Sequence, residues 1–230
     1  MNTLKEKILS RGYWLTVIRP SRFVEKRIPN ISDLYPIIRK NSVSLRGWDF
    51  PHLDSRNPYR IDIDWIGEDF EWEHHLSSWR FYQSGQFIHL SAIAIDWRDQ
   101  SSFWPADENW EPNKLLGVGD VIFNYTEIIE LGSRLALSDA GDEAMHIEIK
   151  TGNLQRRTLY MDDPRKWGFF EIFTTKINEF PYIIDPTKTE LITNSKSLAV
   201  SASIELFKRF GWNATNEQIS SWQEGLIKQR

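Results

Sequence analysis

An acidic stretch at residues 62–75 is the densest group of side chains that could do chemistry. It holds six carboxylates and two adjacent histidines. On an extended strand, Asp62 and Asp64 would share one face about 7 Å apart, where their oxygens could bracket a hard cation such as Mg²⁺. His74 and His75 would point to opposite faces, which does not suit chelation of one zinc ion. The alternative is a solvated acidic edge that discourages strand pairing.

A second candidate site lies at residues 142–150. Glu148 and Lys150 alternate on a predicted strand, and Asp142 precedes them. An acidic pair that holds Mg²⁺, with a lysine that polarises water, is typical of metal-dependent nucleases and phosphohydrolases. The short spacing from Asp142 and the lack of a Pro-Asp dipeptide depart from that pattern. The alternative is a surface pair between Glu148 and Arg157 across a hairpin.

The first 60 residues combine basic and aromatic side chains. They carry a net charge of +7, whereas residues 61–148 carry −14 and residues 149–230 carry +3. Guanidinium groups beside aromatic rings can hold phosphates and stack on bases, which predicts a face for an anionic partner, either nucleic acid or an acidic protein surface. The alternative is that the basic and acidic segments neutralise each other in one fold. The predicted face consists of Arg22, Arg27, Arg46, Trp48 and His52.

Tryptophan is frequent in this chain. Seven of its 11 tryptophans lie between Trp48 and Trp110. Indole offers a large apolar surface and one N–H donor, which suits a core, an aromatic pocket or an interface hot spot. The segment 65–110 is therefore also a candidate surface for a protein partner, in which case the chain would be an obligate subunit of a larger complex.

Several classes of protein are excluded by what the sequence lacks. It has no nucleophile elbow, zinc-protease helix motif, P-loop or dinucleotide fingerprint. It also has no cysteine, which removes disulfides and thiolate chemistry. No apolar run approaches the roughly 18 residues of a membrane span, and the first residues lack the apolar core of a signal peptide, so we expect a cytoplasmic protein without a membrane partner. These features favour a non-catalytic binding or regulatory module without a cofactor, with a Mg²⁺-dependent nuclease or phosphohydrolase as the alternative.

Two short strings carry a resemblance to a known family. They are Arg-Gly-Tyr-Trp at residues 11–14 and Leu-Arg-Gly-Trp-Asp-Phe-Pro-His at residues 45–52. Together they resemble an uncharacterised bacterial family whose segments also occur N-terminal to a Schlafen-type AlbA nucleic-acid domain. The similarity covers about residues 11–97, and no AlbA-like segment follows. The resemblance implies a sensor or regulatory role.

Hydrophobic periodicity and turn residues outline the elements that must position these groups. A two-residue turn at Ser84-Gly85 would place Arg80 opposite His89, and a turn at residues 151–153 would join a second hairpin. The strand at 87–95 is apolar on nearly both faces and should be central. Strands are predicted at 13–18, 42–48, 59–66, 79–83, 86–97, 145–150 and 155–161, and helices at 4–10, 32–40, 118–137, 195–210 and 216–228.

Hairpins rather than βαβ crossovers dominate this order of elements. The sequence therefore predicts an α+β fold with a mainly antiparallel sheet, helices packed on one face, and a C-terminal helical pair. We expect one domain over residues 1–230, with the only tempting boundary near residues 139–142.

Overall fold

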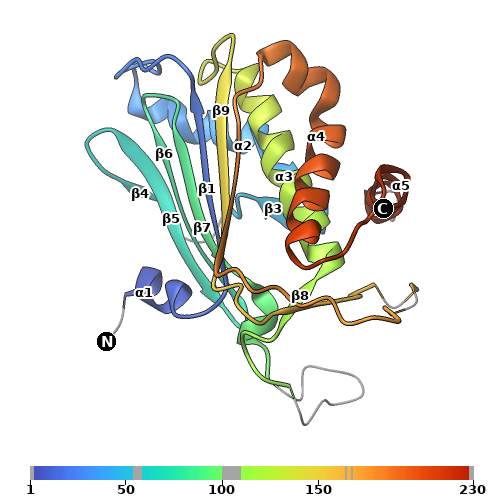
Figure 1. The fold of residues 1–230 in the computed structure, drawn as a ribbon. Coiled ribbons are helices and arrows are strands. Elements are labelled where there is room, and N and C mark those ends of the chain that lie inside the picture. Colours follow the sequence, from blue (N-terminus) through green and yellow to red (C-terminus); the bar gives the residue numbers. More distant parts are fainter. Residues whose placement is uncertain (1–2, 54–58, 100–109, 164, 167, 228–230) are drawn as a thin grey trace.

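A seven-stranded antiparallel sheet organises the fold (Figure 1). The computed structural model describes residues 3–53, 59–99, 110–163, 165–166 and 168–227. The order of the strands is β11-β9-β1-β7-β6-β5-β4. Their bounds are β1 Tyr13–Pro20, β4 Arg60–Ile61, β5 Trp65–Trp72, β6 His75–Tyr82, β7 Phe87–Ala92, β9 Met145–Gly152 and β11 Glu179–Ile184. The α+β class with a mainly antiparallel sheet is confirmed.

The N-terminal strand β1 occupies the middle of the sheet. It pairs with β7 on one side and with β9 on the other, so that Trp14 lies opposite Ser91 and Thr151. Alternate side chains of β1, namely Trp14, Thr16 and Ile18, are fully or almost fully buried. This alternation is the period of two that a strand covered on one face requires. β1 and β7 precede residues 139–142 in the sequence, and β9 follows them. One sheet therefore contains strands from both sides of that predicted boundary.

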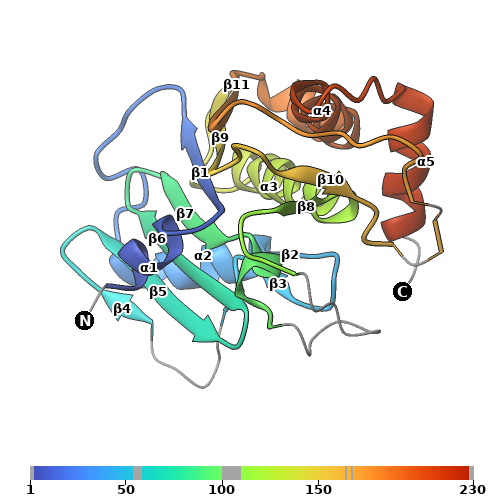
Figure 2. The same ribbon diagram turned by 60° about the horizontal axis from the view of Figure 1, so that its bottom comes forward.

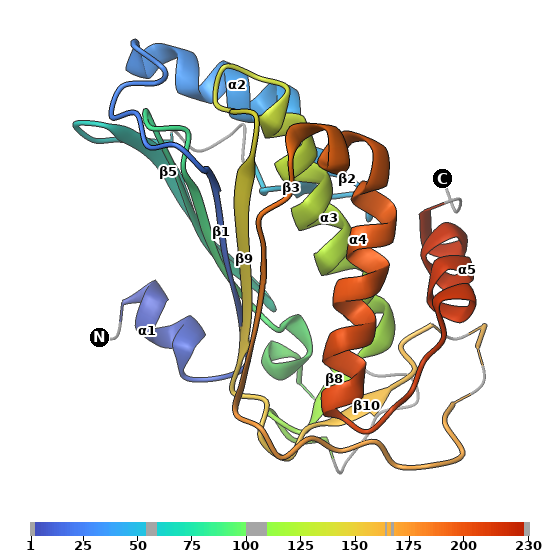
Figure 3. The same cartoon turned by 45° about the horizontal axis from the view of Figure 1, so that its top comes forward.

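Helices cover both faces of the sheet unequally (Figure 3). The long helices α3 and α4 pack on one face, and apolar positions of α3 such as Val121, Ile128 and Leu135 are buried there at helical spacing. The short helix α1 covers the other face, where Ile8 joins a small cluster with Leu76 and Leu90. The helix bounds are α1 Leu4–Leu9, α2 Leu34–Asn41, α3 Val118–Ala136, α4 Lys188–Arg209 and α5 Asn216–Ile227.

Two small sheets complete the structure. β8 (Leu115–Gly117) and β10 (Thr158–Tyr160) pair in parallel and lie beside α3 in Figure 2. β2 (Val43–Ser44) pairs with β3 (Asp49–Phe50). Short 3₁₀ helices lie at Ile31–Asp33 (η1) and at Ala94–Trp97 (η2), directly after β7. The C-terminal helical pair α4–α5 is confirmed, with Gly211 at φ +86° between the two helices, a conformation that favours glycine.

Several expectations about the strands are wrong. Of the predicted strand 42–48 only Val43–Ser44 (β2) is a strand, and the predicted strand 86–97 ends at Ala92 and is followed by η2. The segment 59–66 is not one strand, because residues 62–64 form the turn between β4 and β5, in which the Ile63 N–H donates to the Asp62 carboxylate at 2.8 Å. The hairpin after β6 has a longer turn, so His89 faces Trp79 instead of Arg80. β10 pairs with β8 instead of with β9, and therefore Glu148 and Arg157 are not a cross-strand pair.

Arg157 is instead the centre of a buried polar network. Its side chain is 0% exposed and forms a bidentate pair with Asp96, which is 1% exposed. The Asp96 carboxylate also accepts the backbone N–H groups of Gly12 at 2.9 Å and Asn113 at 2.8 Å. Arg157 in turn donates to the carbonyl of Leu115. The network therefore joins the start of β1 to η2 and to the residues before β8.

The first turn of α4 gives a test of local stability. Thr187 and Glu190 form a capping box in which each side chain accepts the other residue's backbone N–H, at 3.2 and 2.8 Å. We expect Thr187→Ala to lower the free energy of unfolding by about 1 kcal/mol, because the Glu190 N–H loses its acceptor and the Glu190 carboxylate loses the hydroxyl that donates to it. Urea unfolding would measure the change. An unchanged midpoint would show that solvent replaces the cap.

Candidate ligand-binding site

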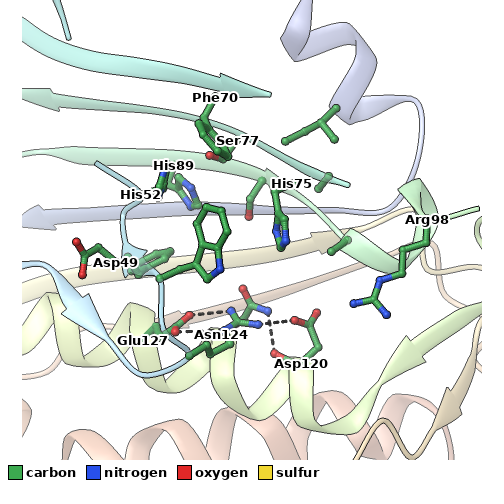
Figure 4. A pocket seen from close by; sticks show the side chains of 17 residues that line it. Asp49, His52, Phe70, His75, Ser77, His89, Arg98, Asp120, Asn124 and Glu127 are labelled. Carbon is green, nitrogen blue, oxygen red and sulfur yellow. Dashed lines mark hydrogen bonds and ion pairs between the residues drawn. The ribbon is translucent and has the colours of Figure 1, made fainter. Parts of the chain in front are cut away.

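A cavity of about 360 Å³ opens between the helix-covered face of the sheet, the segment from Arg46 to His52, and helix α3 (Figure 4). Strands β5, β6 and β7 supply Phe70, His75 and His89 to its walls, and α3 supplies three polar side chains. Segments from four separate parts of the chain thus meet at one hollow. We call this hollow the aromatic cavity.

Aromatic rings and imidazoles form one wall of the aromatic cavity. Trp48 stacks on His75 with ring centroids 5.0 Å apart and lies 4.9 Å from His52. His52 lies 4.1 Å from Phe70, and its carbonyl accepts the Trp79 indole N–H at 3.0 Å, which fixes this segment to the core. Trp48 remains 38% exposed. It is therefore placed to cover one face of a flat ligand.

His89 on β7 is buried deep in the aromatic cavity. It is 5% exposed and lies between Phe50 and Phe87, with ring centroids 5.0 and 6.1 Å away. Burial lowers the pKa of His89 to about 3, so the ring is neutral at physiological pH. Its Nδ1 has no hydrogen-bond partner among the described residues. A buried polar atom without a partner is costly, and a bound molecule could satisfy it.

His75 is a second neutral imidazole in the same wall. Burial lowers its pKa to about 4, and the neighbouring His74 and the positive charges of Arg46 and Arg98 act in the same direction. A neutral imidazole offers one donor and one acceptor. The aromatic cavity therefore presents hydrogen-bonding groups without charge on its sheet side.

Helix α3 closes the opposite side of the aromatic cavity with Asp120, Asn124 and Glu127. Arg46 binds Glu127 through two contacts at 2.7 and 3.2 Å and binds Asp120 at 2.7 Å. Burial would lower the pKa of Arg46, but these two carboxylates outweigh it and raise that pKa above its ordinary value. The guanidinium of Arg46 is thus engaged by the protein itself.

Arg98 is the contrasting cation. It lines the aromatic cavity, and within the described part of the chain it makes no ion pair, and its Nε has no hydrogen-bond partner. The residue directly follows η2, whose Asp96 is held by the buried Arg157. The backbone that carries Arg98 is therefore firmly placed, while its charge is available to an anion.

A second cavity, of about 530 Å³, adjoins the first and shares four residues with it. We call it the apolar cavity. Its charged rim is internally bound: the Asp162 carboxylate accepts the N–H groups of Gly119 and Asp120 at the start of α3, and Asp163 pairs with Arg165. Burial raises the pKa of Asp162 despite these hydrogen bonds. The shared residues are Arg46, Ala94, Arg98 and Asp120, and the apolar lining includes Ile95, Phe123, Met161 and Leu226.

The structure separates the five residues of the predicted basic face. Arg46, Trp48 and His52 line the aromatic cavity, whereas Arg22 and Arg27 both pair with Asp142 and line neither cavity. Arg27 also donates to the carbonyl of Gly141. All three arginines of the predicted face thus meet carboxylates of the acidic segment, as the alternative of internal neutralisation expects.

The residues proposed for metal chemistry lie in two separate parts of the structure. Asp142 precedes the first residue of β9. Lys150 lies near the end of that strand and pairs with Glu179 at 2.9 Å. Glu148 lies on β9 between them. Asp62 and Asp64 belong to the exposed β4–β5 turn. In the described ranges, no group of three or more histidines and carboxylates is arranged to hold a metal ion.

The tryptophans of segment 65–110 have several environments. Trp79 is buried in the core, Trp72 is 50% exposed, and Trp97 lies beneath the cations of Lys7 and Arg11. Trp104 lies outside the described residues. The segment is therefore not one continuous tryptophan surface. Among the described helices, none combines the length and the apolar character needed to cross a bilayer.

Reasoning from the sequence missed His89, Arg98 and the polar face of α3. A histidine within an otherwise apolar strand was a usable signal for His89. Arg98 carries no such signal, because its lack of a partner depends on the fold. Comparisons with family models, curated proteins and solved structures gave no match, so the site is interpreted from its geometry.

Proposed function

We propose that this protein is a non-catalytic binding protein whose ligand is a small aromatic acid held in the aromatic cavity. A flat ring would pack beside the stacked pair of Trp48 and His75, and its acidic group would reach Arg98. The proposal keeps the binding or regulatory role expected from the sequence, but it replaces an extended basic face with a cavity.

One observation carries the proposal: Arg98 lines an aromatic cavity and, in the described ranges, has no ion-pair partner there. Arg46, in the same wall, is bound by two carboxylates and is not available in this way. A charge-assisted contact to a carboxylate is stronger than a neutral hydrogen bond. The unpartnered Nδ1 of buried His89 supports the same conclusion, since it offers a polar contact deep in the cavity.

Calorimetric titration of the whole chain with aromatic acids tests the proposal. The probes are benzoate, phenylacetate, indole-3-acetate and N-acetyl-L-phenylalanine, each compared with its neutral amide. We expect at least one acid to bind and its amide to bind about tenfold or more weakly, because the amide loses the charged contact. If no acid binds at millimolar concentration, or if acids and amides bind equally, the proposal is wrong.

Replacing Arg98 gives the corresponding test on the protein. We expect Arg98→Gln to weaken binding of the best acid by about ten- to hundredfold and to leave binding of its amide unchanged. Arg22→Gln is the matched control, since Arg22 is 76% exposed and lines neither cavity. Equal affinities in the wild-type chain and Arg98→Gln would contradict the assigned role.

A further inference from the structure

The two cavities share one wall, and the chemistry of that wall indicates what could bind across it. Arg46, Ala94, Arg98 and Asp120 line both hollows. Since Arg46 and Asp120 are bound to each other, Arg98 is the shared charged residue left for a ligand within the described chain. An acidic group on Arg98 would therefore sit where the two cavities meet, and other parts of the same molecule could extend into each.

The two cavities differ in what they offer those parts. The aromatic cavity presents rings and neutral imidazoles. The apolar cavity presents half-buried hydrocarbon from Phe123, Met161 and Leu226. Its rim carboxylates are already satisfied, Asp162 by backbone N–H groups and Asp163 by Arg165. Apart from the Tyr160 hydroxyl, a polar or charged group entering there would find few partners, whereas an apolar arm would bury surface.

We infer that the apolar cavity binds an apolar arm of the same ligand whose ring occupies the aromatic cavity and whose acidic group meets Arg98. The ligand class is an aromatic acid with an apolar arm attached close to its acidic group. The simplest example is an N-acylated aromatic amino acid, in which the ring, the carboxylate and the acyl arm diverge from one carbon. This inference rests on the proposed function and adds the second cavity to it.

A series of N-acyl-L-phenylalanines tests the inference on the whole chain. The acyl groups are acetyl, butanoyl, hexanoyl and octanoyl, and affinities are measured by calorimetry below the aggregation concentration of each compound. We expect affinity to rise by about fourfold for each sheltered methylene, until the arm outgrows the cavity. Equal affinities along the series, with binding retained, would overturn the inference and leave the proposed function standing. No binding by any member, while another of the aromatic acids binds, would overturn the inference alone, whereas no binding by any aromatic acid would overturn both.

Variants show where the arm lies. We expect Met161→Gln and Leu226→Gln to abolish most of the gain from acetyl to hexanoyl while changing the affinity of the acetyl compound less than twofold. Ile192→Gln is the matched control, because Ile192 is an exposed apolar residue on α4 that lines neither cavity. If the gain with chain length persists in both cavity variants, the arm binds elsewhere and the inference is wrong. Circular dichroism of each variant confirms that it is folded.

Discussion

Replacing Asp96 by alanine should lower the free energy of unfolding by about 3–5 kcal/mol, which is the largest effect we expect from a single substitution. Arg157 would keep its charge in a position that is 0% exposed, with its carboxylate partner removed. The N–H groups of Gly12 and Asn113 would lose their acceptor as well. Urea unfolding followed by tryptophan fluorescence would measure the change.

The exposed pair Lys208–Glu205 on α4 provides the control for that experiment. Glu205→Ala should cost less than about 1 kcal/mol, because solvent screens the pair. The double variant Asp96→Leu with Arg157→Met removes both charges together, and we expect it to be more stable than Asp96→Ala. If Asp96→Ala costs no more than Glu205→Ala, the network does not hold η2 and β1 in place.

Acid should destabilise this protein partly through His89. The folded-state pKa of His89 is about 3, below the ordinary value for histidine of about 6.5. As pH falls below about 6.5, His89 binds a proton in the unfolded chain but stays neutral in the folded chain. The free energy of unfolding therefore decreases between about pH 6.5 and pH 3. The full shift corresponds to a loss on the order of 4–5 kcal/mol.

The variant His89→Leu isolates this contribution from that of other titrating groups. We expect its free energy of unfolding to fall less steeply than that of the wild-type chain between pH 6.5 and pH 3. Urea unfolding at a series of pH values would give both curves. Parallel curves would show that His89 accepts a proton in the folded state as readily as in the unfolded state.

The fold could be predicted from the sequence where the signal is local. Helix α3 shows its apolar residues at helical spacing, and the predicted range 118–137 differs from Val118–Ala136 by one residue. Gly211, at positive φ, and the Thr215 hydroxyl, which accepts the Gln218 N–H at 3.2 Å, likewise separate α4 from α5 through local contacts. Such signals come from residues that are close together in the sequence, so they can be recognised before the fold is known.

Pairing of strands was harder to predict because it depends on turn geometry and on distant partners. The alternation of Ile61, Ile63 and Trp65 suits one strand, but Asp62 accepts a backbone N–H and helps the chain reverse. The turn after Tyr82 is one residue longer than the predicted turn, and this shifts the register so that His89 lies opposite Trp79 instead of Arg80. The same dependence hid the buried Arg157, whose partner Asp96 is 61 residues away.

The candidate site was predictable only in part, for a related reason. Trp48 and His52 were selected as aromatic and polar groups beside arginines, and both line the aromatic cavity. The same reasoning treated Arg22, Arg27 and Arg46 as equivalent free cations. The sequence records a charge, but whether a carboxylate lies within reach depends on the fold.

The central position of β1 has a consequence for how the chain folds. The partners of Tyr13–Pro20 are β7, which ends at Ala92, and β9, which ends at Gly152. During synthesis, β1 can pair on both edges only after β9 has been synthesised, when most of the chain has emerged from the ribosome. Contacts this distant in sequence slow folding, and an unpaired apolar strand invites association between chains. Nascent chains that end before β9 should depend on chaperones more than complete ones do.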